Sequence, residues 1–178
     1  SKSLLTYWFQ TEHENGFEYY FAQRESVESI IYLYEHEQIR NQSELLKYDS
    51  SGVLVDSMFE EPWLRLVIKQ ATGTGKTKVL SLLMAWCYFH KEFNEDSKLS
   101  QNFLLLAPNT IVLDRLKDDI DGLSVFNKDP VIPPNGFAGR SWNFYPKVHI
   151  QDNIGTLSKS GNIFLTNVQR FVKRTEKV

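Results

Sequence analysis

The chain has 178 residues, of which 42% are hydrophobic and 24% charged, as in an ordinary globular domain with a sizeable core. The net charge of −2 and the pI of about 6.1 give no overall electrostatic case for nucleic acid, although one groove can be cationic in a neutral protein. A single cysteine, Cys87, excludes an intrachain disulfide and favours a reducing, cytoplasmic setting. No stretch has the length and apolarity of a membrane span, and the first residues lack a signal-peptide layout.

Residues 1–62 are expected to form an N-terminal extension that is rich in aromatic residues between positions 4 and 22. Asn15-Gly16 divides the aromatic run and favours a tight turn, with a small β-hairpin around it. We expect the rings to pack on the rest of the chain, and a surface for a partner is the alternative interpretation.

A helix is predicted over about residues 23–38, because apolar residues recur there at the spacing of one helical face. These residues are Val27, Ile30, Ile31 and Tyr34. Gln23 stands at the start of this helix, where a capping or solvated polar residue is the ordinary interpretation. The following residues, 39–62, carry few signals beyond a turn at 49–52 and a break at Pro62.

Residues 63–178 are expected to form a second part, which opens with a short strand, Trp63–Lys69. The strand leads into Gln70–Thr77, with the sequence Gln-Ala-Thr-Gly-Thr-Gly-Lys-Thr, and an apolar helix is predicted from Thr77 to about Lys91. This strand–loop–helix context indicates a phosphate-binding loop rather than a surface turn with a chance Gly-Lys-Thr.

The residue types of this loop suit the binding of phosphate. Gly73 and Gly75 have no Cβ, so the backbone can approach an anion at positive φ, and the N–H groups and helix N-terminus face it. Lys76 reaches the β- and γ-phosphates, and the hydroxyl of Thr77 is placed to bind Mg²⁺. The general motif has glycine where this loop has Gln70, and in this departure the loop resembles those of helicases.

Two further buried strands are predicted, Phe103–Ala107 and Asn162–Thr166, with a helix after the first that runs to about Ile120. A half-exposed strand, Lys147–Gln151, is expected near a sheet edge because its apolar residues alternate. Continuous apolar strands separated by helices are typical of an α/β fold with a parallel sheet and right-handed crossovers. Proline-rich residues 121–146 are expected to form a long loop with little regular structure.

Taken in order, these motifs resemble those of superfamily-2 helicases and translocases, and most closely the Res subunit of type III restriction enzymes. The phosphate loop corresponds to motif I, and residues 21–30 look like the segment ahead of it. Residues 105–115 are similar to motif Ia, and 165–169 to the Thr-Asn motif. The resemblance covers about residues 19–171 and implies an incomplete P-loop (RecA-like) parallel sheet flanked by helices.

The resemblance also implies a nucleotide site for ATP and Mg²⁺, with Lys76 and Thr77 as its catalytic residues. Gln23 would recognise the adenine edge, where a side-chain amide can donate and accept at once. The residues that would hold the nucleotide are Gln23, Thr72, Gly73, Thr74, Gly75, Lys76 and Thr77.

Residues at the strand ends would contact DNA through its phosphates, without recognising sequence. By resemblance they are Pro108, Asn109, Arg115, Thr166, Asn167 and Gln169. For Asn109, Thr166 and Asn167, capping of the segment that follows each strand is an equally good interpretation, and both can hold together. A helix is predicted to begin after Asn167.

Several features of the family are not found in this sequence. No Asp-Glu box follows an apolar strand, and the nearest acidic residue, Asp152, comes before the Thr-Asn motif. A second RecA-like domain with its arginine finger, and a nuclease domain, would lie elsewhere in the protein. We therefore expect an N-terminal piece of a larger enzyme, which binds nucleotide weakly and hydrolyses almost none.

The expected parent is an ATP-dependent DNA translocase that acts as the restriction (endonuclease) subunit, with DNA and the modification (methyltransferase) subunit as partners. A stand-alone superfamily-2 helicase or defence ATPase without a nuclease is one alternative, and a non-catalytic nucleotide-binding module is another. Other phosphate-loop classes, such as small-molecule kinases, would not explain Pro108-Asn109 and Thr166-Asn167 at strand ends.

Overall fold

The computed structural model describes residues 1–55, 63–151 and 153–171, which belong to two compact units. The first, called here the sheet unit, joins residues 1–18 to the chain from residue 77 onward. The second, the loop unit, consists of residues 19–76. The break expected at Pro62 and the acidic residue Asp152 lie outside the described residues, and the expected boundary between residues 62 and 63 stays a prediction.

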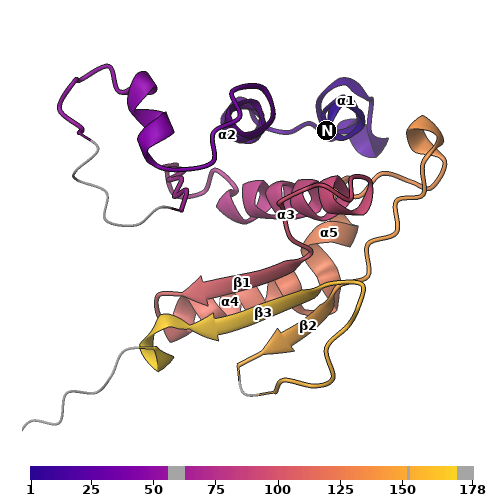
Figure 1. Cartoon of the computed structure of the whole chain (residues 1–178). Helices are drawn as coiled ribbons and strands as arrows, with labels where there is room; N and C mark the ends of the chain where they lie inside the picture. Colours follow the sequence, from indigo (N-terminus) through magenta and orange to yellow (C-terminus); the bar gives the residue numbers. More distant parts are fainter. Residues whose placement is uncertain (56–62, 152, 172–178) are drawn as a thin grey trace, which may run out of the picture. The chain divides into compact units, whose positions relative to one another are not determined.

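The sheet unit is built on a parallel three-stranded sheet with the order β1-β3-β2 (Figure 1). The strands are β1 (Asn102–Ala107), β2 (Lys147–Ile150) and β3 (Asn162–Asn167). Central β3 buries Ile163 and Leu165 completely, as expected for a strand with neighbours on both sides. The predicted parallel α/β sheet is confirmed, with β2 at an edge.

Helices flank this sheet, as expected for an incomplete RecA-like fold. α4 (Thr110–Ile120) lies behind the sheet in Figure 1 and buries Leu113 and Ile120. α3 (Lys76–Glu92) is buried on nearly all sides, so its continuous apolar sequence predicted its environment correctly. The buried residues of α3 are Val79, Ser81, Leu82, Met84, Ala85, Trp86, Tyr88 and Phe89.

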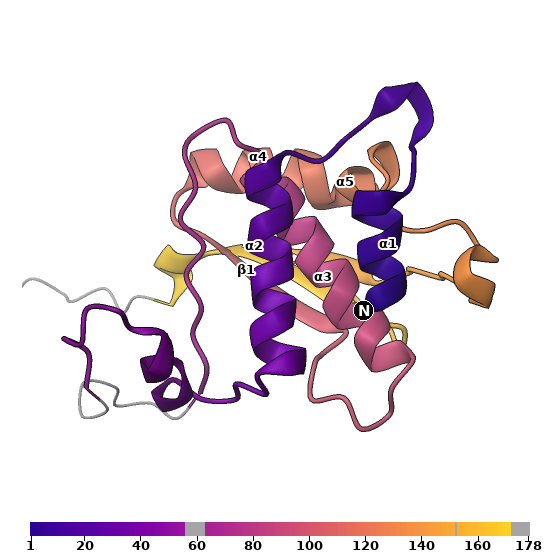
Figure 2. The ribbon, with the colours of Figure 1, turned by 90° about the horizontal axis from the view of Figure 1, so that it is seen from above.

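The aromatic N-terminus forms a helix, so the predicted hairpin is wrong. α1 (Lys2–Gln10) runs alongside α3 (Figure 2), where the indole of Trp86 donates to the Ser1 hydroxyl at 2.7 Å. Leu4 and Trp8 are both buried, and their i, i+4 spacing gives one helical face. A turn does form at Asn15, whose φ is 57°, but no strands flank it.

The segment 121–146 contains more regular structure than its prolines suggested. A short helix, α5 (Ser124–Lys128), buries Val125 and Phe126, and 3₁₀ turns cover Asp121–Leu123 and Phe137–Gly139. A helix of five residues is too short to show a periodic apolar pattern, which explains why the sequence did not predict it. After Asn167, where a helix was predicted to begin, the described residues form a 3₁₀ turn, η7 (Val168–Arg170).

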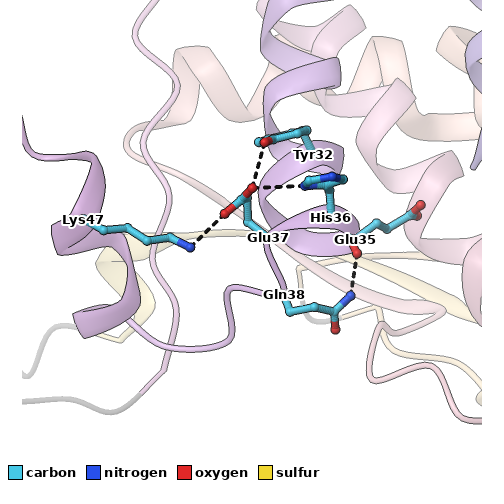
Figure 3. A network of polar contacts seen from close by, with 6 residues as sticks. All are labelled: Tyr32, Glu35, His36, Glu37, Gln38 and Lys47. Carbon is cyan, nitrogen blue, oxygen red and sulfur yellow. Dashed lines mark hydrogen bonds and ion pairs between the residues drawn. The ribbon is translucent and has the colours of Figure 1, made fainter.

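The loop unit begins with α2 (Phe21–Ile31), which continues as a π-helical turn, η2 (Tyr32–His36). The α-helix therefore ends earlier than predicted. Figure 3 shows the contacts that hold the segment after η2. The Glu37 carboxylate accepts hydrogen bonds from Lys47 Nζ at 2.8 Å and from the Tyr32 hydroxyl at 2.7 Å. These contacts join η2 to a 3₁₀ helix, η3 (Ser43–Tyr48).

The predicted strand Trp63–Lys69 is not formed. The segment belongs to no sheet of the described ranges, and Val67 is 91% exposed. A strand needs a neighbour to satisfy its N–H and C=O groups, and the described part of the chain supplies none here. No helix of the described ranges has both the length and the apolarity to cross a membrane.

Candidate nucleotide-binding site

The glycine-rich loop turns directly into α3, which begins at Lys76. Gly73 and Gly75 have φ angles of 83° and 78°, in the left-handed region that side chains disfavour. A Cβ built on Gly73 meets no atom within 4 Å, so the backbone angle and not crowding requires glycine there. The Thr74 hydroxyl donates to the Ala71 carbonyl at 2.8 Å and closes the loop.

Lys76 folds back over the start of the loop. Its Nζ donates to the carbonyl of Ala71 at 2.7 Å and to that of Gln70 at 3.2 Å. These are neutral acceptors at an exposed lysine, so a phosphate group would compete with them strongly for the ammonium. Thr77 follows in the first turn of α3, where backbone N–H groups lack intrahelical partners.

Gln23 is brought to the phosphate loop from α2. Its Nε2 donates to the Thr74 carbonyl at 2.9 Å, and its Oε1 accepts from the Tyr20 N–H at 3.0 Å. The second contact is half of a capping box, which confirms the capping interpretation of this residue. Each end of the amide thus makes one hydrogen bond and keeps one further position, although the side chain is only 5% exposed. Recognition of adenine stays a prediction.

The loop residues suit a nucleoside triphosphate with Mg²⁺. The glycine angles, the ammonium of Lys76 and the helix N-terminus form a cationic, donor-rich lining for phosphate. Within the described ranges, no group of three or more His, Cys, Asp or Glu side chains could hold a metal ion. The expectation that Mg²⁺ binds here therefore rests on one side-chain ligand, the Thr77 hydroxyl.

The strand-end residues meet at one edge of the sheet. Ala107 of β1 pairs with Asn167 of β3, so the segments after both strands start side by side. Asn109 Oδ1 accepts from the Val112 N–H at 2.9 Å, and Asn167 Oδ1 accepts from the Gln169 N–H at 2.8 Å. The capping interpretation is confirmed for both asparagines.

Contacts of these residues with DNA stay a prediction. Pro108 and Asn109 are exposed, as are Arg115 on α4 and Gln169. Thr166 is half-buried beside Leu106. Within the described residues, its side chain does not cap the segment that follows β3.

The contacts of Gln70 were not predicted from the sequence, in which this residue is only a departure from the general motif. Gln70 Nε2 donates to Ser26 Oγ at 2.9 Å and to the Ala22 carbonyl at 3.0 Å. Both acceptors belong to α2. The only signal in the sequence was a long amide side chain where glycine is usual.

Comparison with known proteins matches residues 17–178 to a family model described as type III restriction enzyme, res subunit. The chain belongs to this Res family. No curated protein and no solved structure matches significantly. The Res family is one of ATP-dependent, helicase-like motors. Its match includes α2, the phosphate loop and both strand ends, and it leaves out α1.

Proposed function

We propose that this chain is the ATP-binding portion of a DNA translocase, the restriction subunit of a type III restriction–modification enzyme. One observation carries the proposal. The loop Gln70–Gly75 has its glycines at positive φ, leads straight into a helix N-terminus, and has the Lys76 ammonium over its first two carbonyls. The Res family then connects this loop to a motor that moves on DNA.

Each loop residue has a defined task in this proposal. ATP with Mg²⁺ supplies the phosphoanhydride bond whose cleavage drives the motor. Lys76 gives up the Ala71 carbonyl and binds phosphate oxygens as a point charge. Thr77 offers its hydroxyl to the metal ion, and the glycine backbone donates N–H groups. Gln23 and Thr74 keep the far side of the loop in contact with α2.

We also propose that these 178 residues alone hydrolyse almost no ATP. Hydrolysis needs an acidic metal ligand, an oriented water and a cation on the transferred phosphate. The sequence has no Asp-Glu pair after a strand, and an absent arginine finger alone costs about 10³- to 10⁵-fold in rate.

DNA and the modification subunit are the proposed partners. What supports DNA is the position of Asn109 and Asn167 at neighbouring strand ends, where N–H groups and short polar side chains suit phosphates. What supports the modification subunit is the family description alone.

Titration with a fluorescent ATP analogue tests the nucleotide site. Lys76→Ala should weaken binding at least tenfold, because the only side-chain cation of the loop is lost. Lys69→Ala is the matched control, since Lys69 is an exposed lysine just before the loop, and its affinity should equal that of the wild type. Equal binding by Lys76→Ala and the wild type would refute the site.

Steady-state ATPase assays with and without DNA test the proposed inactivity of the chain alone. We expect phosphate release at the level of the Lys76→Ala protein under both conditions. Turnover comparable to that of a working motor, stimulated by DNA and abolished by Lys76→Ala, would show that the chain hydrolyses ATP unaided.

A further inference from the structure

The side chain of Gln70 fastens the start of the phosphate loop to α2. Its Nε2 has two protons, and the two acceptors, Ser26 Oγ and the Ala22 carbonyl, lie at 2.9 and 3.0 Å. The Ser26 hydroxyl donates its own proton to the same Ala22 carbonyl at 2.7 Å, so its lone pair is available to Gln70. The three groups form a closed network in which every proton has an acceptor.

A second amide fastens the tip of the loop to the same helix. Gln23 Nε2 donates to the Thr74 carbonyl, four residues beyond Gln70. Ala22 and Ser26 stand at i and i+4 on α2, with Gln23 beside them, so one side of the helix holds both ends of the loop. Without these contacts, a segment whose Ala71, Thr72 and Gly73 are exposed would have little to order it.

The position of Lys76 depends on this attachment. One of the two carbonyls that bind its ammonium belongs to Gln70 itself, so the residue held by α2 also holds the lysine. A glycine at position 70, as in the general motif, could provide the carbonyl but not the contacts with α2.

We propose that Gln70 is a positioning residue: its amide holds the phosphate loop on α2 in the shape that receives a triphosphate. The consequence for binding rests on the proposed nucleotide-binding function, whereas the attachment itself does not. Preformed loops bind more tightly because less ordering is left to occur on binding.

The Oε1 atom of Gln70 lets an effect on the position of the loop be distinguished from an effect on global stability. This atom is buried and makes no hydrogen bond to any described residue. Burial of an unpaired amide oxygen is unfavourable, and substitution by alanine removes that cost together with the two hydrogen bonds. We therefore expect Gln70→Ala to loosen the loop while the midpoint of global unfolding changes little.

Backbone ¹⁵N relaxation of the full chain without nucleotide tests the attachment. In Gln70→Ala, the order parameters of residues 71–75 should fall from the value of a rigid backbone, about 0.85, towards the flexible range below about 0.6, while those of β3 stay unchanged. Ser26→Ala should act in the same direction, and Ser26→Thr, which keeps a hydroxyl, should restore the order parameters. Gln10→Ala, outside the loop unit, is the control. Unchanged order parameters of the loop in Gln70→Ala would overturn the proposal.

Calorimetric titration with ATP and with inorganic triphosphate tests the consequence. Gln70→Ala should weaken both ligands by a similar factor of about three to ten, because the loop and not the base is affected. The Gln70→Ala, Ser26→Ala double variant should bind no worse than the weaker single variant. A loosened loop with wild-type affinity for both ligands would overturn the positioning role. If the wild type binds neither ligand, the proposed nucleotide site is refuted, and the relaxation measurement still decides whether Gln70 holds the loop on α2.

Discussion

The interactions that stabilise the sheet unit internally differ from those that stabilise the loop unit internally. In the sheet unit, side chains such as Leu82, Ile163 and Leu165 are completely buried. In the described part of the loop unit, the buried apolar side chains are Val27, Ile31 and Ile39. The ends of the phosphate loop depend instead on two glutamine amides. Apolar burial thus forms the scaffold, and polar contacts shape the candidate site.

This difference suits the proposed function. A typical hydrogen bond contributes only about 0.5–1.5 kcal/mol net, so polar contacts can be exchanged for those of a ligand at small cost. A buried Leu side chain stabilises far more, and its loss cannot be compensated locally. The loop unit can therefore change its contacts on binding while the sheet unit stays intact.

The strongest expected effect concerns Cys87 in α3, a partly buried residue of the sheet unit. Burial raises the pKa of its thiol from 9.0 to about 12. At pH 8 the reactive thiolate should therefore be about 10³-fold rarer than in the unfolded chain, since each pKa unit is a factor of ten. Reaction with a thiol reagent should be slow in buffer and fast in urea. Equal rates in both would show that the scaffold opens readily around α3.

Leu165→Ala should destabilise the chain by about 2–5 kcal/mol, because it leaves a cavity under the central strand. Urea unfolding measures this loss. The control is Val67→Ala in the unpaired segment before the loop, where 91% exposure predicts a change within about 0.5 kcal/mol. A loss above about 1.5 kcal/mol for Val67→Ala would mean that this segment packs as a strand after all.

Asn109→Ala should cost about 0.5–2 kcal/mol, the usual effect of losing an N-cap side chain. Asn109→Ser keeps an acceptor oxygen and should recover most of the stability. Thermal unfolding followed by circular dichroism measures both variants. A Ser variant as unstable as the Ala variant would argue that Asn109 acts through something other than its cap on α4.

The features that could be predicted from the sequence are those that local pattern determines. Continuous apolar runs predicted β1 and β3, an apolar helix predicted α3, and the cap at Asn109 followed from its place after a strand. Residue types and spacing also predicted the positive φ of Gly73 and Gly75.

What could not be predicted depends on partners that are distant in sequence. Whether Trp63–Lys69 forms a strand depends on a neighbouring strand, which local alternation cannot reveal. Gln70 is 44 residues from Ser26, so their contact has no local signature. At the N-terminus, burial of Leu4 and Trp8 overrode the β-propensity of the aromatic run.

The smallest expected effect concerns Glu37, at the surface of the loop unit. Hydrogen bonds from Lys47, Tyr48, Tyr32 and His36 hold the pKa of its carboxyl well below the ordinary 4.5. A lowered pKa means that the carboxylate stabilises the fold above pH 4.5, and that this contribution is lost as the pH falls through the folded-state pKa. Because Lys47 is exposed, water screens the pair and the effect should be modest.

Glu37→Gln should therefore speed amide exchange in residues 32–48 at pH 7, and the difference from wild type should shrink as the pH falls below 4.5. Glu25→Gln on α2 is the matched control, because Glu25 is an exposed carboxylate of the same unit. A difference that stays constant down to low pH would mean that Glu37 acts through its shape and not its charge. In that case the hydrogen bonds drawn in Figure 3 would hold η3 without help from the ion pair. The loop unit would then differ from the apolar sheet unit by its hydrogen bonds and not by its charges.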